Sequence, residues 1–132
     1  MIADIFSNSH IRIKADPADA VLIVTWAGRQ TEQTVMDGCM RIYECMKTLQ
    51  RFDILNDNRH VIGDWREASQ WVGTVWFPLM DKAGLKKFAW VKSPLDLPQA
   101  SIDETLSSVD ISVFPIRVFH DYQQGFTWLM KS

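Results

Sequence analysis

The sequence has little of what marks a chain for membranes, oxidising compartments or nucleic acid. Only two of its 132 residues are cysteines, and the formal net charge is −2. Without a basic excess, binding to nucleic acid is not expected. No apolar run approaches the roughly 20 residues that span a bilayer. Residues 1–9 also lack the basic start and apolar run of a secretory signal. We therefore expect a cytoplasmic protein without an integral membrane segment.

The sequence also lacks the usual signatures of catalysis and metal binding. It contains no Gly-x-Ser-x-Gly elbow, no Walker loop and no dinucleotide glycine fingerprint. His10, His60 and His120 stand on separate expected elements, without close-spaced ligand pairs. If Cys39 and Cys45 share a helix, they lie about 9 Å apart along its axis and on different sides. We predict no enzymatic activity, no metal site, no cofactor, and two half-buried thiols without a redox role.

What is present suits one α/β domain spanning residues 1–132. The chain is 47% hydrophobic and 23% charged, and its length allows a single core. The alternation of apolar and charged residues over Ile11–Asp16 predicts a strand with one wet face. The unbroken apolar run Val21–Val24 predicts its hairpin partner, covered on both faces. Apolar residues at three- and four-residue steps between Thr31 and Leu49 then predict a long amphipathic helix.

Helices and strands are expected to alternate through the rest of the chain. Short strands are predicted at His60–Gly63, Lys87–Lys92 and Ile116–Phe119. A helix should separate each pair, and Pro94–Pro98 is expected to form a loop. Because parallel strands need crossover connections, this order predicts a mostly parallel sheet with one antiparallel strand and flanking helices.

Capping residues are expected at the starts of three helices. Asp64 with Glu67, and Ser101 with Glu104, have the spacing of a capping box. Pro78 should disturb or close the first of these helices, and the second should end near Ser108. Asp121 is expected to cap a terminal helix. We expect four apolar residues to lie on or near the inward face of that helix: Tyr122, Phe126, Leu129 and Met130.

This succession, with Asp64-Trp65 after the third strand of the pattern and the run 117–121 leading to Trp128-Leu129, resembles the SpoIIAA-like small proteins of the STAS superfamily. The resemblance implies a four-to-five-stranded sheet flanked by helices. It also implies a non-catalytic role in signalling or protein association, and a distant likeness to lipid-binding CRAL-TRIO domains.

The phosphorylated motif of that family is not matched in this chain. The family's anti-sigma-factor antagonists carry Asp-Ser-Ser-Gly or Asp-Ser-Thr-Gly at the start of the helix after the third strand. The corresponding residues here are Asp64-Trp65-Arg66-Glu67. Only the aspartate is shared, so the usual phosphoserine switch is not expected. Ser69, one turn further on, is expected to be solvated or bonded back to its own helix.

Three tryptophans follow the corner between the third expected strand and its helix. Trp65 stands at the corner itself, where open α/β sheets place their ligand crevice. At 100° per residue, Trp71 and Trp76 fall on the two margins of the buried helical stripe. The middle of that stripe is expected to consist of Ala68, Val72, Val75 and Leu79. These tryptophans are interpreted either as core residues over the sheet or as a groove for an apolar ligand or another subunit.

Polar and cationic side chains are also expected at the carboxyl ends of the strands. The set consists of Arg29, Arg66, Lys92, Ser93 and His120. Together with helix N-termini they would favour an anion, such as a phosphate or a lipid headgroup. Asp64 and Asp121 already occupy those helix starts and would repel an anion. An anion site and scattered surface charge are therefore both open interpretations.

These observations predict a non-catalytic binding or regulatory module that acts through protein–protein association, with another protein or a second copy as partner. The expected binding residues are Trp65, Arg66, Trp71, Trp76, Arg29 and His120. The alternative is a small carrier that holds an apolar or lipid ligand in an aromatic groove.

Overall fold

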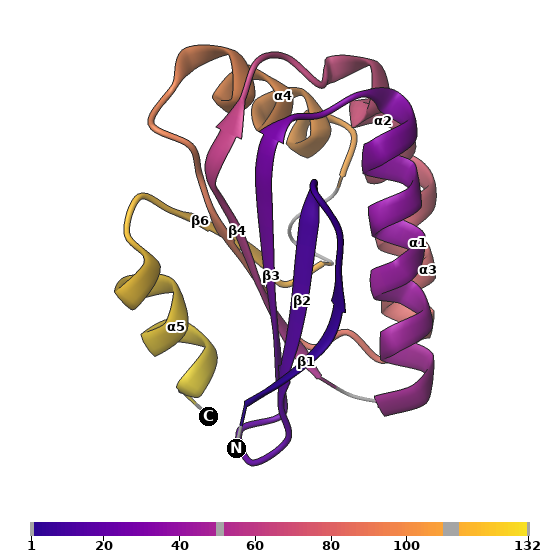
Figure 1. Ribbon diagram of the computed structural model, residues 1–132, viewed down its shortest axis with the longest axis vertical. Helices are drawn as coiled ribbons and strands as arrows, with labels where there is room; N and C mark the ends of the chain where they lie inside the picture. The colour runs from indigo at the N-terminus through magenta and orange to yellow at the C-terminus, as the bar shows by residue number, and fades with distance from the viewer. Residues whose placement is uncertain (1, 50–51, 110–113, 132) are drawn as a thin grey trace.

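The computed structural model describes residues 2–49, 52–109 and 114–131, which form a six-stranded sheet with helices on both faces (Figure 1). The strands stand in the sheet in chain order. They are β1 (Ala3–Ser7), β2 (Ile11–Asp16), β3 (Val21–Arg29), β4 (Asp53–Ile62), β5 (Phe88–Val91) and β6 (Ile116–Phe119). Strands β1 to β3 pair antiparallel, whereas β3 to β6 pair parallel.

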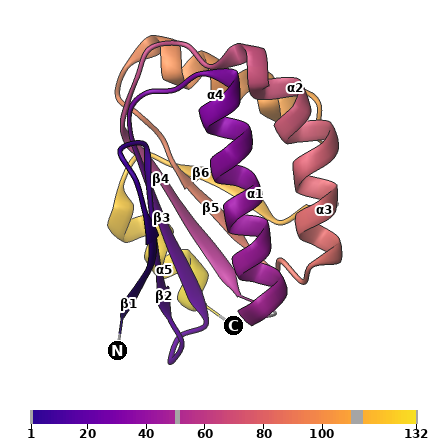
Figure 2. The ribbon, with the colours of Figure 1, turned by 45° about the vertical axis from the view of Figure 1, so that its right-hand side comes forward.

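Most of the helical residues cover one face of the sheet (Figure 2). That face carries α1 (Glu32–Leu49), a composite helical segment and α4 (Asp96–Ser107). The composite segment consists of η1 (Arg66–Ala68), α2 (Ser69–Trp71), η2 (Val72–Trp76) and α3 (Phe77–Lys82). The opposite face carries α5 (Tyr122–Met130). The sequence prediction of a mostly parallel α/β sheet is confirmed, but there are six strands and not four or five, and two antiparallel pairings and not one.

Each face of the sheet has its own hydrophobic cluster. Leu22 and Val24 of β3 belong to the larger cluster, under α1, the composite segment and α4. Val21 and Ile23 belong to the smaller cluster, which packs against α5. Successive strand residues point to opposite faces, so this division confirms the prediction that the Val21–Val24 strand is covered on both sides.

Two strands differ from the sequence prediction. β4 begins at Asp53, seven positions before the expected His60. Its middle contains the buried polar residues Asn56, Asp57 and Asn58, which interrupt the apolar pattern used to predict strands. β1 was not predicted because it is an edge strand whose side chains are mostly exposed, and so its sequence carries no alternating burial pattern.

The helix starts also differ. α4 begins at Asp96, so Ser101 lies in its middle and caps nothing. Pro98, expected in a loop, lies in the first turn of α4, where a missing N–H breaks no helical hydrogen bond. Asp64 and Glu67 form no capping box either: Asp64 Oδ1 accepts from the backbone N–H of Arg66 at 2.8 Å, in a local turn.

The terminal helix largely follows its prediction. Asp121 Oδ2 accepts from the backbone N–H of Gln124 at 3.2 Å, which confirms Asp121 as the cap of α5. Leu129 is buried, as expected, whereas Met130 is 39% exposed and does not lie on the buried face.

The composite segment contains a π-helical turn over Val72–Trp76, where the backbone N–H of Phe77 donates to the carbonyl oxygen of Val72. A π turn holds more residues than an α turn, so it shifts the buried face along the chain. Consequently Trp76, Phe77 and Met80 face the core, whereas Val75 is 42% exposed. The expected stripe is correct at Ala68 and Val72 and wrong beyond them.

Candidate functional site

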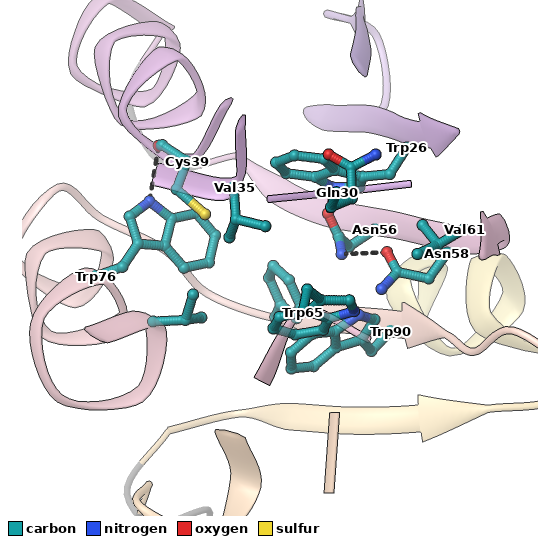
Figure 3. A pocket seen from close by; sticks show the side chains of 12 residues that line it. Trp26, Gln30, Val35, Cys39, Asn56, Asn58, Val61, Trp65, Trp76 and Trp90 are labelled. Atoms are coloured by element: carbon teal, nitrogen blue, oxygen red, sulfur yellow. Dashed lines mark hydrogen bonds between the residues drawn. The ribbon is translucent and has the colours of Figure 1, made fainter. Parts of the chain in front are cut away.

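Four of the six tryptophans line one cavity between the sheet and the helices on its larger face (Figure 3). They are Trp26, Trp65, Trp76 and Trp90. The cavity has a volume of about 30 Å³, which is room for one or two water molecules. The other residues that line it are Gln30, Val35, Cys39, Asn56, Asn58, Val61, Val72 and Phe88. It lies toward the carboxyl ends of β3, β4 and β5, where α/β sheets place their ligands.

Local features of the chain bring two of these indoles into place. Trp26 of β3 packs directly on Gly38 of α1: a Cβ atom at Gly38 would lie 2.7 Å from Cζ3 of the indole. Glycine therefore allows α1 to approach the ring. The π turn carries Trp76 inward, and its Nε1 donates to the carbonyl oxygen of Cys39 in α1 at 2.7 Å.

The other two indoles stack on each other. Trp65 follows β4 and Trp90 lies in β5, and their ring centroids are 6.1 Å apart with an interplanar angle of 28°. Phe88 meets Trp90 edge-on at 5.4 Å and Trp76 edge-on at 5.8 Å. These are favourable aromatic geometries, and they join three of the four tryptophans into a single wall.

A short hydrogen-bonded chain crosses the sheet side of the cavity. Trp26 Nε1 donates to Asn56 Oδ1 at 2.9 Å, and Asn56 Nδ2 donates to Asn58 Oδ1 at 3.1 Å. All three side chains are buried. An indole nitrogen can only donate, so Asn56 must turn its oxygen toward Trp26 and its nitrogen toward Asn58. The same logic fixes the orientation of the Asn58 amide.

The indole nitrogen of Trp90 is the unusual group of the cavity. It is buried and has no hydrogen-bond partner among the residues that the structure describes. In the sheet register Trp90 stands beside Asn56, so both side chains belong to the same wall. Leaving a buried donor unpaired costs about 1–3 kcal/mol. A native protein keeps few such groups, and each one requires an explanation.

The described lining of the cavity carries no formal charge. None of the described residues that line it is an aspartate, glutamate, lysine, arginine or histidine. Burial raises the pKa of the Cys39 thiol well above its usual range, so this side chain is neutral as well. Gln30 is also engaged, because its Nε2 donates to the carbonyl oxygen of Ala27 and its Oε1 accepts from Thr34 Oγ1, both at 2.9 Å.

The structure places the three predicted tryptophans differently from the expected open groove. Trp65 is 5% and Trp76 is 2% exposed, so neither lies at the rim of the sheet. Both line the cavity, whereas Trp71 is half-buried and packs against the outside of the core. For Trp65 and Trp76 the structure therefore bears out the interpretation as core residues over the sheet, and the space that they line is a small cavity rather than an open groove.

The predicted cationic residues do not form one site. Arg66 is exposed and pairs with Asp64 at 2.8 Å, and this guanidinium, with the Arg66 backbone N–H, lowers the pKa of Asp64 to about 2. Arg29 and His120 are exposed at the ends of β3 and β6, with two strands between them. None of the three lines the cavity as the described residues form it.

Ser93 and Ser69 both have structural roles. Ser93 is buried and donates to the carbonyl oxygen of Val61 at 3.1 Å. Ser69 is fully buried and donates to the carbonyl oxygen of Ser101 at 2.9 Å. The expectation that Ser69 is solvated or bonded to its own helix was therefore wrong. Cys39 and Cys45 are both buried and unpaired with each other, rather than half-buried.

Sequence reasoning missed Trp26, Trp90, Asn56 and Asn58. Trp26 and Trp90 extend or occupy expected strands, and that position was the available signal that they share the face of the sheet. The asparagines lie in the part of β4 that was not predicted.

Comparison with protein-family models, with curated proteins and with solved structures finds no match to this chain. The STAS resemblance therefore stays a prediction. Within residues 2–49, 52–109 and 114–131, no three His, Cys, Asp or Glu side chains are grouped to hold a metal ion. No helix in the described part of the chain is both long and apolar enough to cross a bilayer.

Proposed function

We propose that this protein is a non-catalytic module that binds a small molecule in the tryptophan-lined cavity. The observation that carries the proposal is the unpartnered indole N–H of Trp90, buried beside a cavity at the carboxyl ends of the parallel strands. Apolar walls with few directed polar groups are typical of ligand sites. Because Trp65 and Trp76 are buried, they support an internal ligand better than contact with a partner surface.

The size of the cavity limits the ligand. At about 30 Å³ it is far below the roughly 300–1,000 Å³ of sites for drug-sized ligands. A lipid chain does not fit in this form, so we propose a ligand of a few heavy atoms, up to one ring if the wall yields. The composite segment is the part of the lining best suited to move aside, because its 3₁₀, α and π turns interrupt the regular pattern of helical hydrogen bonds.

Native mass spectrometry of freshly purified protein tests the proposal. We expect a fraction of molecules heavier than the chain, and we expect the extra mass to disappear after denaturation. Val35→Ile adds one methylene to the cavity wall and should lower that fraction. Val118→Ile makes the same chemical change at a half-buried site outside the cavity, and it should leave the fraction unchanged. A protein that stays empty, also after exposure to small neutral aromatic compounds, refutes the proposal.

The second candidate is the association of two copies through β1. This strand is an edge of the sheet, and its Ile5 side chain is 43% exposed. Beside it, between β1 and α1, lies a groove of about 380 Å³. Exposed edge strands pair readily with other strands. Light scattering with size exclusion tests this candidate, because Ile5→Lys should dissociate a dimer whereas Trp71→Ala should not; a monomeric wild type at all concentrations removes it.

A cytoplasmic location and a regulatory role of the STAS kind are compatible with either candidate, and both stay predictions.

A further inference from the structure

We infer that the ligand is a small, neutral, flat molecule that carries a hydrogen-bond acceptor, held by the N–H groups of Trp90 and Asn58. This inference rests on the proposed function, and it names the chemical class that the cavity selects.

The requirement for neutrality follows from the side chains that surround the cavity. None of them is charged, and the Cys39 thiol keeps its proton because burial disfavours the thiolate. An ion that entered would lose its hydration without gaining a counter-charge, which is strongly unfavourable in a buried site. Anions and cations are therefore both excluded, including the phosphate considered for the cationic residues.

The requirement for an acceptor follows from the direction of the hydrogen bonds. Trp26 donates to Asn56 Oδ1, and Asn56 Nδ2 donates to Asn58 Oδ1. In each asparagine the amide oxygen accepts one bond, which leaves the amide nitrogen to donate to the next group. Among the described residues, Asn58 Nδ2 is the last nitrogen of this chain. Bonds aligned in this way polarise one another and strengthen the last donor. Trp90 Nε1 adds a second donor on the same wall.

The wall discriminates against ligands that donate. Each of its side-chain amide oxygens already accepts a hydrogen bond: Asn56 Oδ1 from Trp26, Asn58 Oδ1 from Asn56, and Gln30 Oε1 from Thr34. A ligand that only donates would have to share an oxygen that already accepts one hydrogen bond, and it would leave the Trp90 N–H unpaired. Sites with fixed polar groups reject mismatched ligands through such unpaired groups.

The requirement for a flat body follows from the aromatic walls. Trp65 and Trp90 are stacked with an interplanar angle of 28°, and Phe88 meets Trp90 nearly at a right angle. Once the composite segment yields, a flat ring can add to this arrangement in stacked or edge-on geometry, whereas a thicker, branched aliphatic body would need a larger displacement of the indoles.

Three flat, neutral rings of similar size test the class: pyridine, which accepts; benzene, which does neither; and pyrrole, which donates. Each is titrated into ¹⁵N-labelled protein at pH 8, and the indole N–H signals are followed. We expect pyridine to move the Trp90 signal downfield while the Trp76 signal moves little, because the Trp76 N–H is already bonded to Cys39. Pyrrole should bind more weakly than pyridine.

Two variants provide the matched comparison. Trp90→Phe and Trp76→Phe shrink the same kind of side chain on the same cavity, but only the first removes the free donor. We expect Trp90→Phe to lower the ratio of pyridine to benzene affinity about three- to tenfold, and Trp76→Phe to leave that ratio unchanged.

The outcomes separate the ligand class from the proposed function. If benzene or pyrrole binds in the cavity while the Trp90 signal does not respond to pyridine, the class is wrong and the proposed function stands. If pyridine binds but the affinity ratio survives Trp90→Phe, the donor assignment is wrong. If none of the rings binds and native mass spectrometry finds the protein empty, both are wrong. Because the indole signals are read in the wild type, the test holds even if a variant fails to fold.

Discussion

The hydrogen-bonding state of two indoles leads to a direct prediction about stability. Trp90→Phe and Trp76→Phe remove the same atoms from the same aromatic wall, so their packing losses should be similar. They differ in one respect, because Trp76 Nε1 donates to the Cys39 carbonyl oxygen at 2.7 Å, whereas Trp90 Nε1 has no partner among the described residues.

The expected difference can be estimated from the two nitrogens. Losing the hydrogen bond of Trp76 should cost about 0.5–1.5 kcal/mol, and removing the unpaired N–H of Trp90 should relieve a penalty of about 1–3 kcal/mol. Trp76→Phe should therefore lower the free energy of unfolding by about 2–4 kcal/mol more than Trp90→Phe does. Solvation of these groups in the unfolded chain is common to both variants and cancels from this difference.

Urea unfolding of ligand-free protein, followed by far-ultraviolet circular dichroism, measures this difference without relying on tryptophan fluorescence. Equal m-values for the two variants are the control, because they show that the same surface is exposed on unfolding. If Trp90→Phe costs as much as Trp76→Phe, the Trp90 indole is already hydrogen-bonded in solution. The cavity would then be a hydrated structural site, and the free donor inferred here would not exist.

Three further predictions concern other parts of the structure. Gly38→Ala should lower the free energy of unfolding by about 1–3 kcal/mol, since its Cβ would push the Trp26 indole; an unchanged urea midpoint would show that the ring is not held there. Burial raises the pKa of Asp53, so ionisation weakens folding as pH rises past about 4. Asp53→Asn should therefore raise the free energy of unfolding by less than about 1 kcal/mol at pH 7 and leave it unchanged at pH 3. An equal increase at both pH values would contradict this prediction. Arg66 lowers the pKa of Asp64 to about 2, so their pair supports folding above about pH 4 and is lost toward pH 2. Arg66→Ala should lower the urea midpoint slightly at pH 7 and leave it unchanged near pH 2, and an equal loss at both pH values would exclude the ion pair as its cause.

The elements that were predicted well are those whose burial follows a simple period. α1 buries side chains at three- and four-residue steps, β2 buries alternate side chains, and β3 begins with an unbroken buried apolar run; all three patterns are visible in the sequence. The terminal cap at Asp121 is equally local, because its side chain bonds three residues away. The interactions that form such elements involve residues close together in the chain, so the sequence alone is enough to predict them.

The elements predicted badly depend on distant partners. Asn56 is tolerated inside β4 because Trp26, thirty positions earlier in the chain, donates to its oxygen. The π turn allows Trp76 to reach the Cys39 carbonyl oxygen, a bond that spans 37 positions. The local sequence pattern predicts neither hydrogen bond. For this reason β4 was predicted too short, and the buried stripe of the helical segment was assigned to the wrong residues after Val72.

By itself, the sequence determined the α/β architecture, the order of most elements and the aromatic character of the corner at Trp65, because these depend on local periodicity and composition. Only the tertiary structure decided that Trp65 and Trp76 turn inward, that Trp26 and Trp90 join them, and that the Trp90 N–H has no partner among the described residues. The orientation of a buried donor depends on which groups from distant strands and helices reach it, and that is settled only when the chain has packed.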